Sequence, residues 1–102
     1  MRLFISVACI WAASATLAFS QSVPKLDYRT TCKATPATGM SRQDTIKSCM
    51  NDEQRAQRAL PQVWSKSSRQ SRANCLAETT LGGLPSYVEL LTCLQGNLLA
   101  PN

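Results

Sequence analysis

The sequence predicts a small all-α domain of three helices, held by two disulfides and preceded by an extended N-terminal arm. Apolar residues recur at helical spacing in three stretches, and a serine that can cap a helix opens each of them. No stretch shows the strict alternation that is typical of a half-buried strand. Four cysteines follow an apolar N-terminal segment, a pattern that is typical of an exported domain with a disulfide framework.

Residues 1–20 have the features of a secretory signal peptide. Met1-Arg2 provides a positive start, Leu3 to Phe19 is apolar, and Ala18-Phe19-Ser20 places small residues where a signal peptidase cleaves. We expect a mature chain that begins near Gln21, a periplasmic or secreted location, and only transient contact with the membrane through the signal peptide. Two alternatives are a retained membrane anchor and a lipoprotein-type cleavage before Cys9.

Residues 21–40 are predicted to form the extended arm. Pro24, Pro36 and Gly39 interrupt this stretch, and neither a helical nor an alternating period survives in it. We expect Cys32 to attach the arm to the rest of the domain, with Leu26 and Tyr28 as packing points.

Residues 41–102 are predicted to form the helical domain, and its first helix is expected over residues 42–66. Ser41 and Asp44 form a variant of the capping box. Five apolar positions then fall within an arc of roughly 100° on a helical projection: Ile46, Cys49, Ala56, Leu60 and Val63. The period continues through Pro61, which favours one bent helix over two helices divided at the proline.

Two shorter helices are expected to follow. Ser68 or Ser71 can cap a helix over residues 69–80, in which Ala73, Leu76, Ala77 and Thr80 recur at helical spacing on one face. Gly82-Gly83-Leu84-Pro85 ends that helix. Ser86 and Glu89 form a full capping box for the last helix, which carries Tyr87, Leu91, Leu94 and Leu98 as a stripe widened by Leu90.

Four cysteines outside the signal peptide allow three disulfide connectivities. In an antiparallel hairpin of helices, residues equally distant from the turn lie at the same level, and Cys75 and Cys93 are equally distant from Leu84. This geometry favours Cys75–Cys93 with Cys32–Cys49. Cys49–Cys93 with Cys32–Cys75 is the second choice, and a Cys49–Cys75 link is the least favoured.

The composition excludes several kinds of chemistry. The chain has a formal net charge of +5. It contains no histidine, so it lacks the commonest general base and the commonest metal ligand. The cysteine spacing contains no zinc knuckle, and no nucleophile motif is present. We therefore expect no enzyme activity, no cofactor and no metal site. The basic residues lack interleaved aromatic residues and are offset by Asp44, Asp52 and Glu53, so we also expect no nucleic-acid partner.

The candidate interaction residues are four arginines and a tryptophan: Arg55, Arg58, Trp64, Arg69 and Arg72. The arginines could contact an anionic surface, but a solvated helix face is the favoured interpretation. Trp64 could anchor a partner, but we expect it to pack in the core or at its edge. The adjacent carboxylates Asp52 and Glu53 point about 100° apart on a helix, so we expect them to be structural.

The stretch from Cys49 to Leu94 resembles a group of small exported alphaproteobacterial proteins. The resemblance is carried by Cys49 to Gln54, by Leu60, Trp64 and Cys75, and by the C-terminal element Pro85 to Leu94. It implies a bacterial periplasmic or secreted protein and supplies no catalytic residue.

These observations predict a non-catalytic interaction or structural module whose partner is an unknown protein or an anionic component of the cell envelope. One alternative is a cationic protein that binds surfaces or acts on membranes. Another is a periplasmic stress chaperone, by analogy with the small, helical, disulfide-bonded acid-stress chaperones.

Overall fold

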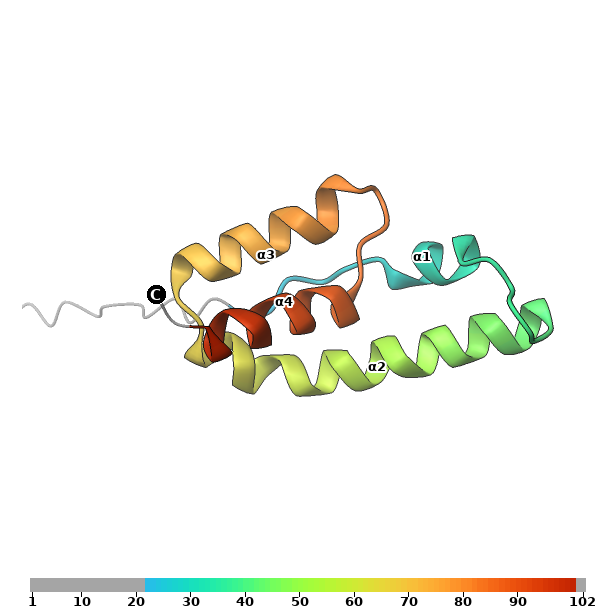
Figure 1. Ribbon diagram of the computed structural model, residues 1–102, viewed down its shortest axis with the longest axis horizontal. Coiled ribbons are helices and arrows are strands. Elements are labelled where there is room, and N and C mark those ends of the chain that lie inside the picture. Colours follow the sequence, from blue (N-terminus) through green and yellow to red (C-terminus); the bar gives the residue numbers. More distant parts are fainter. Residues whose placement is uncertain (1–21, 101–102) are drawn as a thin grey trace, which may run out of the picture.

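The computed structural model describes residues 22–100, and four helices without any strand make up the regular structure of this range (Figure 1). The helices are α1 (Tyr28–Ala34), α2 (Arg42–Lys66), α3 (Arg69–Leu81) and α4 (Tyr87–Leu99). The all-α class is confirmed, but the expected count of three helices is wrong because α1 interrupts the arm. The signal peptide predicted over residues 1–20 lies outside the described residues.

Helix α1 forms where the sequence predicted extended chain. The side chain of Asp27 caps it, accepting hydrogen bonds from the Thr30 hydroxyl at 2.7 Å and from the Thr30 N–H at 3.4 Å. These two bonds lower the pKa of Asp27, so the cap contributes at neutral pH and is lost as acid protonates the carboxyl group. The Thr31 hydroxyl donates to the Pro85 carbonyl at 2.7 Å, which ties α1 to the turn before α4.

Helix α2 is a single helix of 25 residues that contains Pro61, as the unbroken apolar period predicted. Ser41 caps it by accepting the Asp44 N–H at 3.1 Å. Pro61 lies on the exposed side, where water can satisfy the carbonyl group that a proline leaves unpaired.

The predicted serine caps of the two later helices are confirmed. Ser68 accepts the Ser71 N–H at 3.1 Å, and Ser86 accepts the Glu89 N–H at 3.3 Å. The turn between α3 and α4 needs a glycine, since Gly83 has a φ of +73°.

The two disulfides are the pairs that the hairpin geometry favoured. Cys75–Cys93 joins α3 to α4 with a Cα separation of 5.6 Å, and Cys32–Cys49 joins α1 to α2 with a Cα separation of 5.5 Å. Both separations lie within the range that a disulfide requires. The bridges are typical of proteins that fold outside the reducing cytosol.

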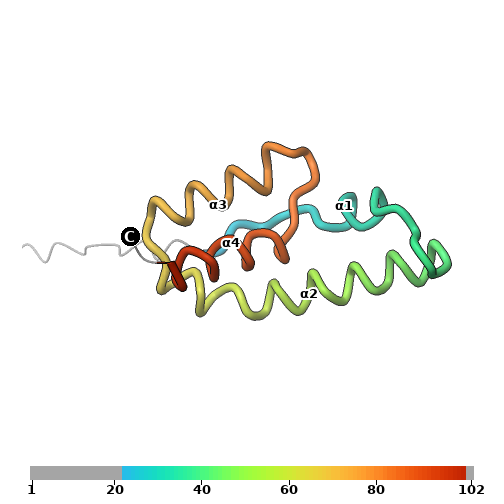
Figure 2. The backbone as a smooth tube through the Cα atoms, in the orientation of Figure 1, coloured from blue at the N-terminus to red at the C-terminus, as the bar shows by residue number. Residues whose placement is uncertain are grey.

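The core lies where α4 packs between α2 and α3 (Figure 2). Its fully buried side chains include Leu60 from α2 and Leu90 and Leu94 from α4. The predicted α4 stripe is therefore rotated: Leu90 is buried, whereas Leu91 is half-buried and Leu98 is 42% exposed. Leu91 packs only at the edge of the core, and the placement of Leu98 in the buried stripe was wrong. Neighbouring leucines give the sequence two equivalent stripes.

The buried face of α3 also differs from the predicted one. Cys75 and Thr79 are buried, Leu76 is half-buried, and Ala73, Ala77 and Thr80 are exposed. The disulfide and a hydrogen-bonded threonine hydroxyl, rather than alanine packing, hold α3 against α4.

Leu94→Ala should lower the free energy of unfolding by about 2–5 kcal/mol, because it opens a cavity in the core. Leu98→Ala is the matched control one turn further along α4, and its effect should stay below about 1 kcal/mol. Urea titrations of the two variants compare them directly. If both variants lost the same free energy of unfolding, α4 would not bury the face that carries Leu90 and Leu94.

Within residues 22–100, no helix is both long enough and apolar enough to cross a bilayer.

Candidate functional site

A buried carboxylate organises the N-terminus of α4. Glu53 of α2 is 3% exposed, and its two oxygens accept hydrogen bonds from the Ser86 hydroxyl and from the Tyr87 N–H, the latter at 2.6 Å. A carboxylate at a helix N-terminus also interacts favourably with the helix dipole. Glu53 therefore fixes α4 against the middle of α2.

Thr79 connects α3 to the same cluster. Its hydroxyl oxygen accepts the Ser86 N–H at 2.9 Å and lies 3.2 Å from both the Ser86 carbonyl and the Glu89 carboxylate. Every buried side-chain nitrogen or oxygen of the described range has a hydrogen-bond partner. The cluster is thus a fully satisfied hydrogen-bond network that joins α2, α3 and α4.

Tyr87 attaches the N-terminal arm to the helices. Its hydroxyl oxygen accepts the Leu26 N–H at 2.9 Å and lies 3.5 Å from the amide nitrogen of Gln57. The Tyr28 ring packs against the Tyr87 ring with centroids 5.6 Å apart. Although the arm has no helix before Tyr28, these contacts hold it along α2 and α4.

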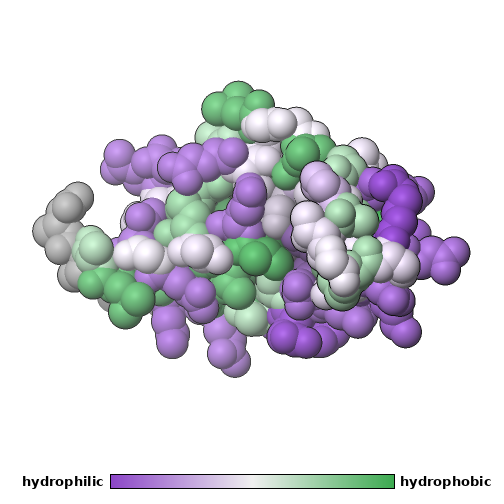
Figure 3. All heavy atoms as spheres, turned by 45° about the vertical axis from the view of Figure 1, so that its right-hand side comes forward, coloured by the Kyte–Doolittle hydropathy of each residue, from purple (hydrophilic) through white to green (hydrophobic). Residues whose placement is uncertain are grey.

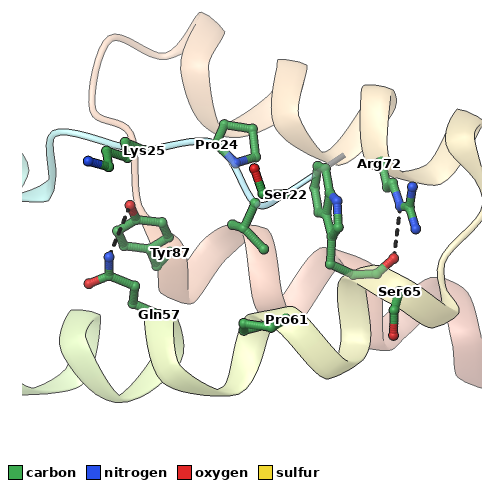
Figure 4. A pocket seen from close by; sticks show the side chains of 10 residues that line it. Ser22, Pro24, Lys25, Gln57, Pro61, Ser65, Arg72 and Tyr87 are labelled. Atoms are coloured by element: carbon green, nitrogen blue, oxygen red, sulfur yellow. Dashed lines mark hydrogen bonds between the residues drawn. The ribbon is translucent and has the colours of Figure 1, made fainter. Parts of the chain in front are cut away.

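An open pocket of about 580 Å³ lies between the arm and the helices (Figure 4). We call it the arm pocket. It is lined by arm residues 22–25, by Gln57, Pro61, Trp64 and Ser65 of α2, by Arg72 of α3 and by Tyr87 of α4. Its volume lies in the range of small-molecule sites.

Arg72 lies at one end of the arm pocket, in contact with Trp64. Its Nε donates to the Trp64 carbonyl at 2.8 Å, a bond drawn in Figure 4. Its guanidinium carbon lies 5.2 Å from the centroid of the Trp64 ring, which is a cation–π distance. Trp64 itself is 6% exposed, so the expectation that it packs in or beside the core is confirmed.

The structure separates the predicted interaction residues into two groups. Trp64 and Arg72 lie together at the arm pocket, whereas Arg55, Arg58 and Arg69 are exposed and do not line it. Arg55 and Arg58 belong to the outward face of α2, opposite the core. The five residues therefore do not form one site.

A second hollow lies near the other end of α2, against α1 and the N-terminus of α4. It has a volume of about 550 Å³, and we call it the α1–α4 groove. Three large apolar side chains that line it are exposed: Met40 by 51%, Leu84 by 45% and Val88 by 37%. Its charged lining residues are all acidic: Asp52, Glu53 and Glu89.

The rest of the visible surface is mixed. Figure 3 shows hydrophobic patches on one face of the molecule that are interrupted by hydrophilic side chains. Outside the groove, Leu81 is 85% exposed at the end of α3 and Leu99 is 87% exposed at the end of α4. These two leucines provide apolar controls that do not line the groove.

Sequence reasoning missed Lys25 as a residue that shapes these sites, and it gave Glu53 only a structural role and Tyr87 only a place in the apolar stripe of the last helix. For Glu53 a signal exists, because it lies three residues before Ala56 and seven before Leu60, on the buried stripe of α2. Lys25 carries no such signal, since its position depends on how the arm packs.

Among residues 22–100, no group of three or more Cys, Asp or Glu side chains is arranged to hold a metal ion. Both hollows have apolar side chains in their walls. The charged residues that line the arm pocket are cations, whereas those that line the groove are carboxylates. No protein-family model, no curated protein and no solved structure matches this chain.

Proposed function

We propose that this protein is a non-catalytic periplasmic or secreted interaction module that binds a partner protein through the α1–α4 groove. The features of a signal peptide in residues 1–20 and the two disulfides support an exported protein. The resemblance to small exported alphaproteobacterial proteins belongs to the same proposal. The Cys32–Cys49 bridge joins the α1 and α2 sides of the groove, and the hydrogen bonds of Glu53 hold the N-terminus of α4 against α2, so the shape of the groove is set before a partner binds.

The observation that carries the proposal is the convergence of three exposed apolar side chains on one hollow. Met40 comes from the loop before α2, Leu84 from the turn after α3, and Val88 from the first turn of α4. Exposed apolar groups that gather in a concave site are typical of binding surfaces, whereas scattered ones need no explanation. The carboxylates of Asp52 and Glu89 line the same groove.

The charges of the groove suggest what the partner presents. An apolar side chain would fill the space beside Leu84 and Val88, and a neighbouring lysine or arginine would face the carboxylates of Asp52 and Glu89. The preferred partner is thus a protein segment that combines an apolar anchor with a positive charge.

The double variant Leu84→Ser, Val88→Ser should reduce recovery of the partner in a pull-down about ten-fold or more, because apolar anchors dominate interface energies. The tagged protein is expressed from its full sequence in the producing bacterium, and captured proteins are quantified by mass spectrometry. The matched control is Leu81→Ser, Leu99→Ser, which removes two exposed leucines outside the groove.

Equal recovery of the partner with both double variants would contradict the groove proposal.

A second function, binding to an anionic surface, is favoured by the exposed Arg55 and Arg58 on α2. Binding to anionic vesicles that is lost on Arg55→Gln, Arg58→Gln but kept in the groove variant would establish that function instead.

A further inference from the structure

The arm pocket combines apolar walls with positive charge. Val23, Pro24 and Pro61 contribute apolar surface, and Trp64 and Tyr87 contribute aromatic rings. Its two charged lining residues are both cations, Lys25 and Arg72, and none of its lining residues is acidic. Figure 4 shows these cations at opposite ends of the pocket. An apolar molecule that carries one negative group matches this lining in both polarity and charge.

Arg72 is held in place before any ligand binds. The Nε bond to the Trp64 carbonyl and the contact with the Trp64 ring orient its guanidinium group. A guanidinium is planar and binds a carboxylate through parallel hydrogen bonds. Because a fixed side chain loses little conformational freedom on binding, Arg72 is the stronger candidate for the carboxylate contact.

The arm forms the wall that completes the pocket. The Leu26 N–H bond to the Tyr87 hydroxyl fixes the chain directly after residues 22–25, and Tyr87 is 2% exposed. The pocket is thus bounded by α2, α3, α4 and a docked arm, with an opening that admits a ligand.

We propose that the arm pocket binds a small organic monocarboxylate with an aliphatic or aromatic body. The body packs against Pro61 and the Trp64 ring, and the carboxylate lies toward Arg72, with Lys25 adding positive charge from the other end. This site goes beyond the partner-binding groove and does not depend on it, because the two hollows share no lining residue.

Decanoate is the probe, and 1-decanol is its uncharged counterpart. The chain has two tryptophans, and Trp11 lies in the proposed signal peptide; Trp11→Phe makes Trp64 the single indole fluorophore in both the precursor and the mature protein. Titration of protein expressed from the full sequence should give a saturable change in Trp64 fluorescence. Because charge-assisted hydrogen bonds are the strong ones, decanol should bind at least about ten-fold more weakly, and Arg72→Gln should raise the Kd for decanoate about ten-fold.

Arg69→Gln is the matched control, since Arg69 begins the same helix but does not line the pocket. Its Kd should stay within about two-fold of the parent value, as expected for a distant exposed charge. Lys25→Gln is a second pocket variant, and Lys33→Gln is its control outside the pocket. If circular dichroism shows that Arg72→Gln does not fold, the decanoate affinities of this second pair test the site.

Three results would overturn the site: equal affinities for decanoate and decanol, equal losses in the pocket variants and their controls, or no saturable fluorescence change. If the groove variants captured no partner but decanoate still bound, only the groove proposal would fail. The failures of the two proposals are therefore distinguishable.

Discussion

Replacing Cys32, Cys49, Cys75 and Cys93 together by alanine is expected to abolish cooperative folding. The bridges close loops with sequence separations of 17 and 18 residues. In the chain-entropy model each loop of this size contributes about 3 kcal/mol, so both together contribute about 6 kcal/mol. That sum is comparable to the whole net stability of a small domain. The helical circular dichroism signal of the variant should be low and should melt without a sigmoidal transition.

The two single-bridge variants separate the contributions. Cys32→Ala, Cys49→Ala should release α1, and Cys75→Ala, Cys93→Ala should loosen α3 against α4, each at a cost of about 3 kcal/mol. If the four-cysteine variant unfolded cooperatively with the same melting temperature as the parent protein, the disulfides would not be essential for folding. Such a result would mean that packing around Leu60 and Leu94 is sufficient for folding.

Glu53→Ala should lower the free energy of unfolding by about 2–6 kcal/mol, because it leaves two buried donors without an acceptor at a cost of about 1–3 kcal/mol each. The donors are the Ser86 hydroxyl and the Tyr87 N–H. Both belong to the N-terminus of α4, so amide hydrogen exchange in the first turn of α4 should also accelerate. Chemical denaturation and exchange measurements give the two readouts.

Asp52→Ala is the control for this change. Asp52 is the neighbouring carboxylate on α2 and is exposed, so its removal should change stability by about 0.5 kcal/mol or less. If the two variants were equally stable, Glu53 would not be the residue that fixes α4.

The features that sequence reasoning predicted correctly depend on few residues or on simple geometry. Ser41, Ser68 and Ser86 cap their helices through bonds to residues three positions ahead, so the signal is local. The disulfide pairing followed from equal distances to one turn. The continuity of α2 followed from a period that Pro61 does not interrupt.

The errors lie where tertiary contacts decide the structure. Helix α1 has seven residues, too few to show a period, and depends on the Cys32–Cys49 bridge and on the Thr31 bond to Pro85. On α4, Leu90 and Leu91 are equally apolar, and only packing against α2 selects Leu90 for the core.

The arm pocket could be predicted only in part. Arg72 and Trp64 were candidate residues, but their contact depends on how α3 folds back after Ser68. Lys25 and Tyr87 reach the pocket from opposite ends of the described chain, and no local pattern links them. The α1–α4 groove is likewise built from three separate segments.

Site-specific photo-crosslinking tests the proposed function most directly. A photoreactive amino acid replaces Val88 in the groove of the protein expressed from its full sequence, and the same amino acid replaces Leu99 outside the groove in a control. Irradiation of the producing cells should yield a discrete crosslinked protein from position 88 and not from position 99. Identical products at both positions, or none at position 88, would contradict the assignment of the α1–α4 groove as the partner-binding surface.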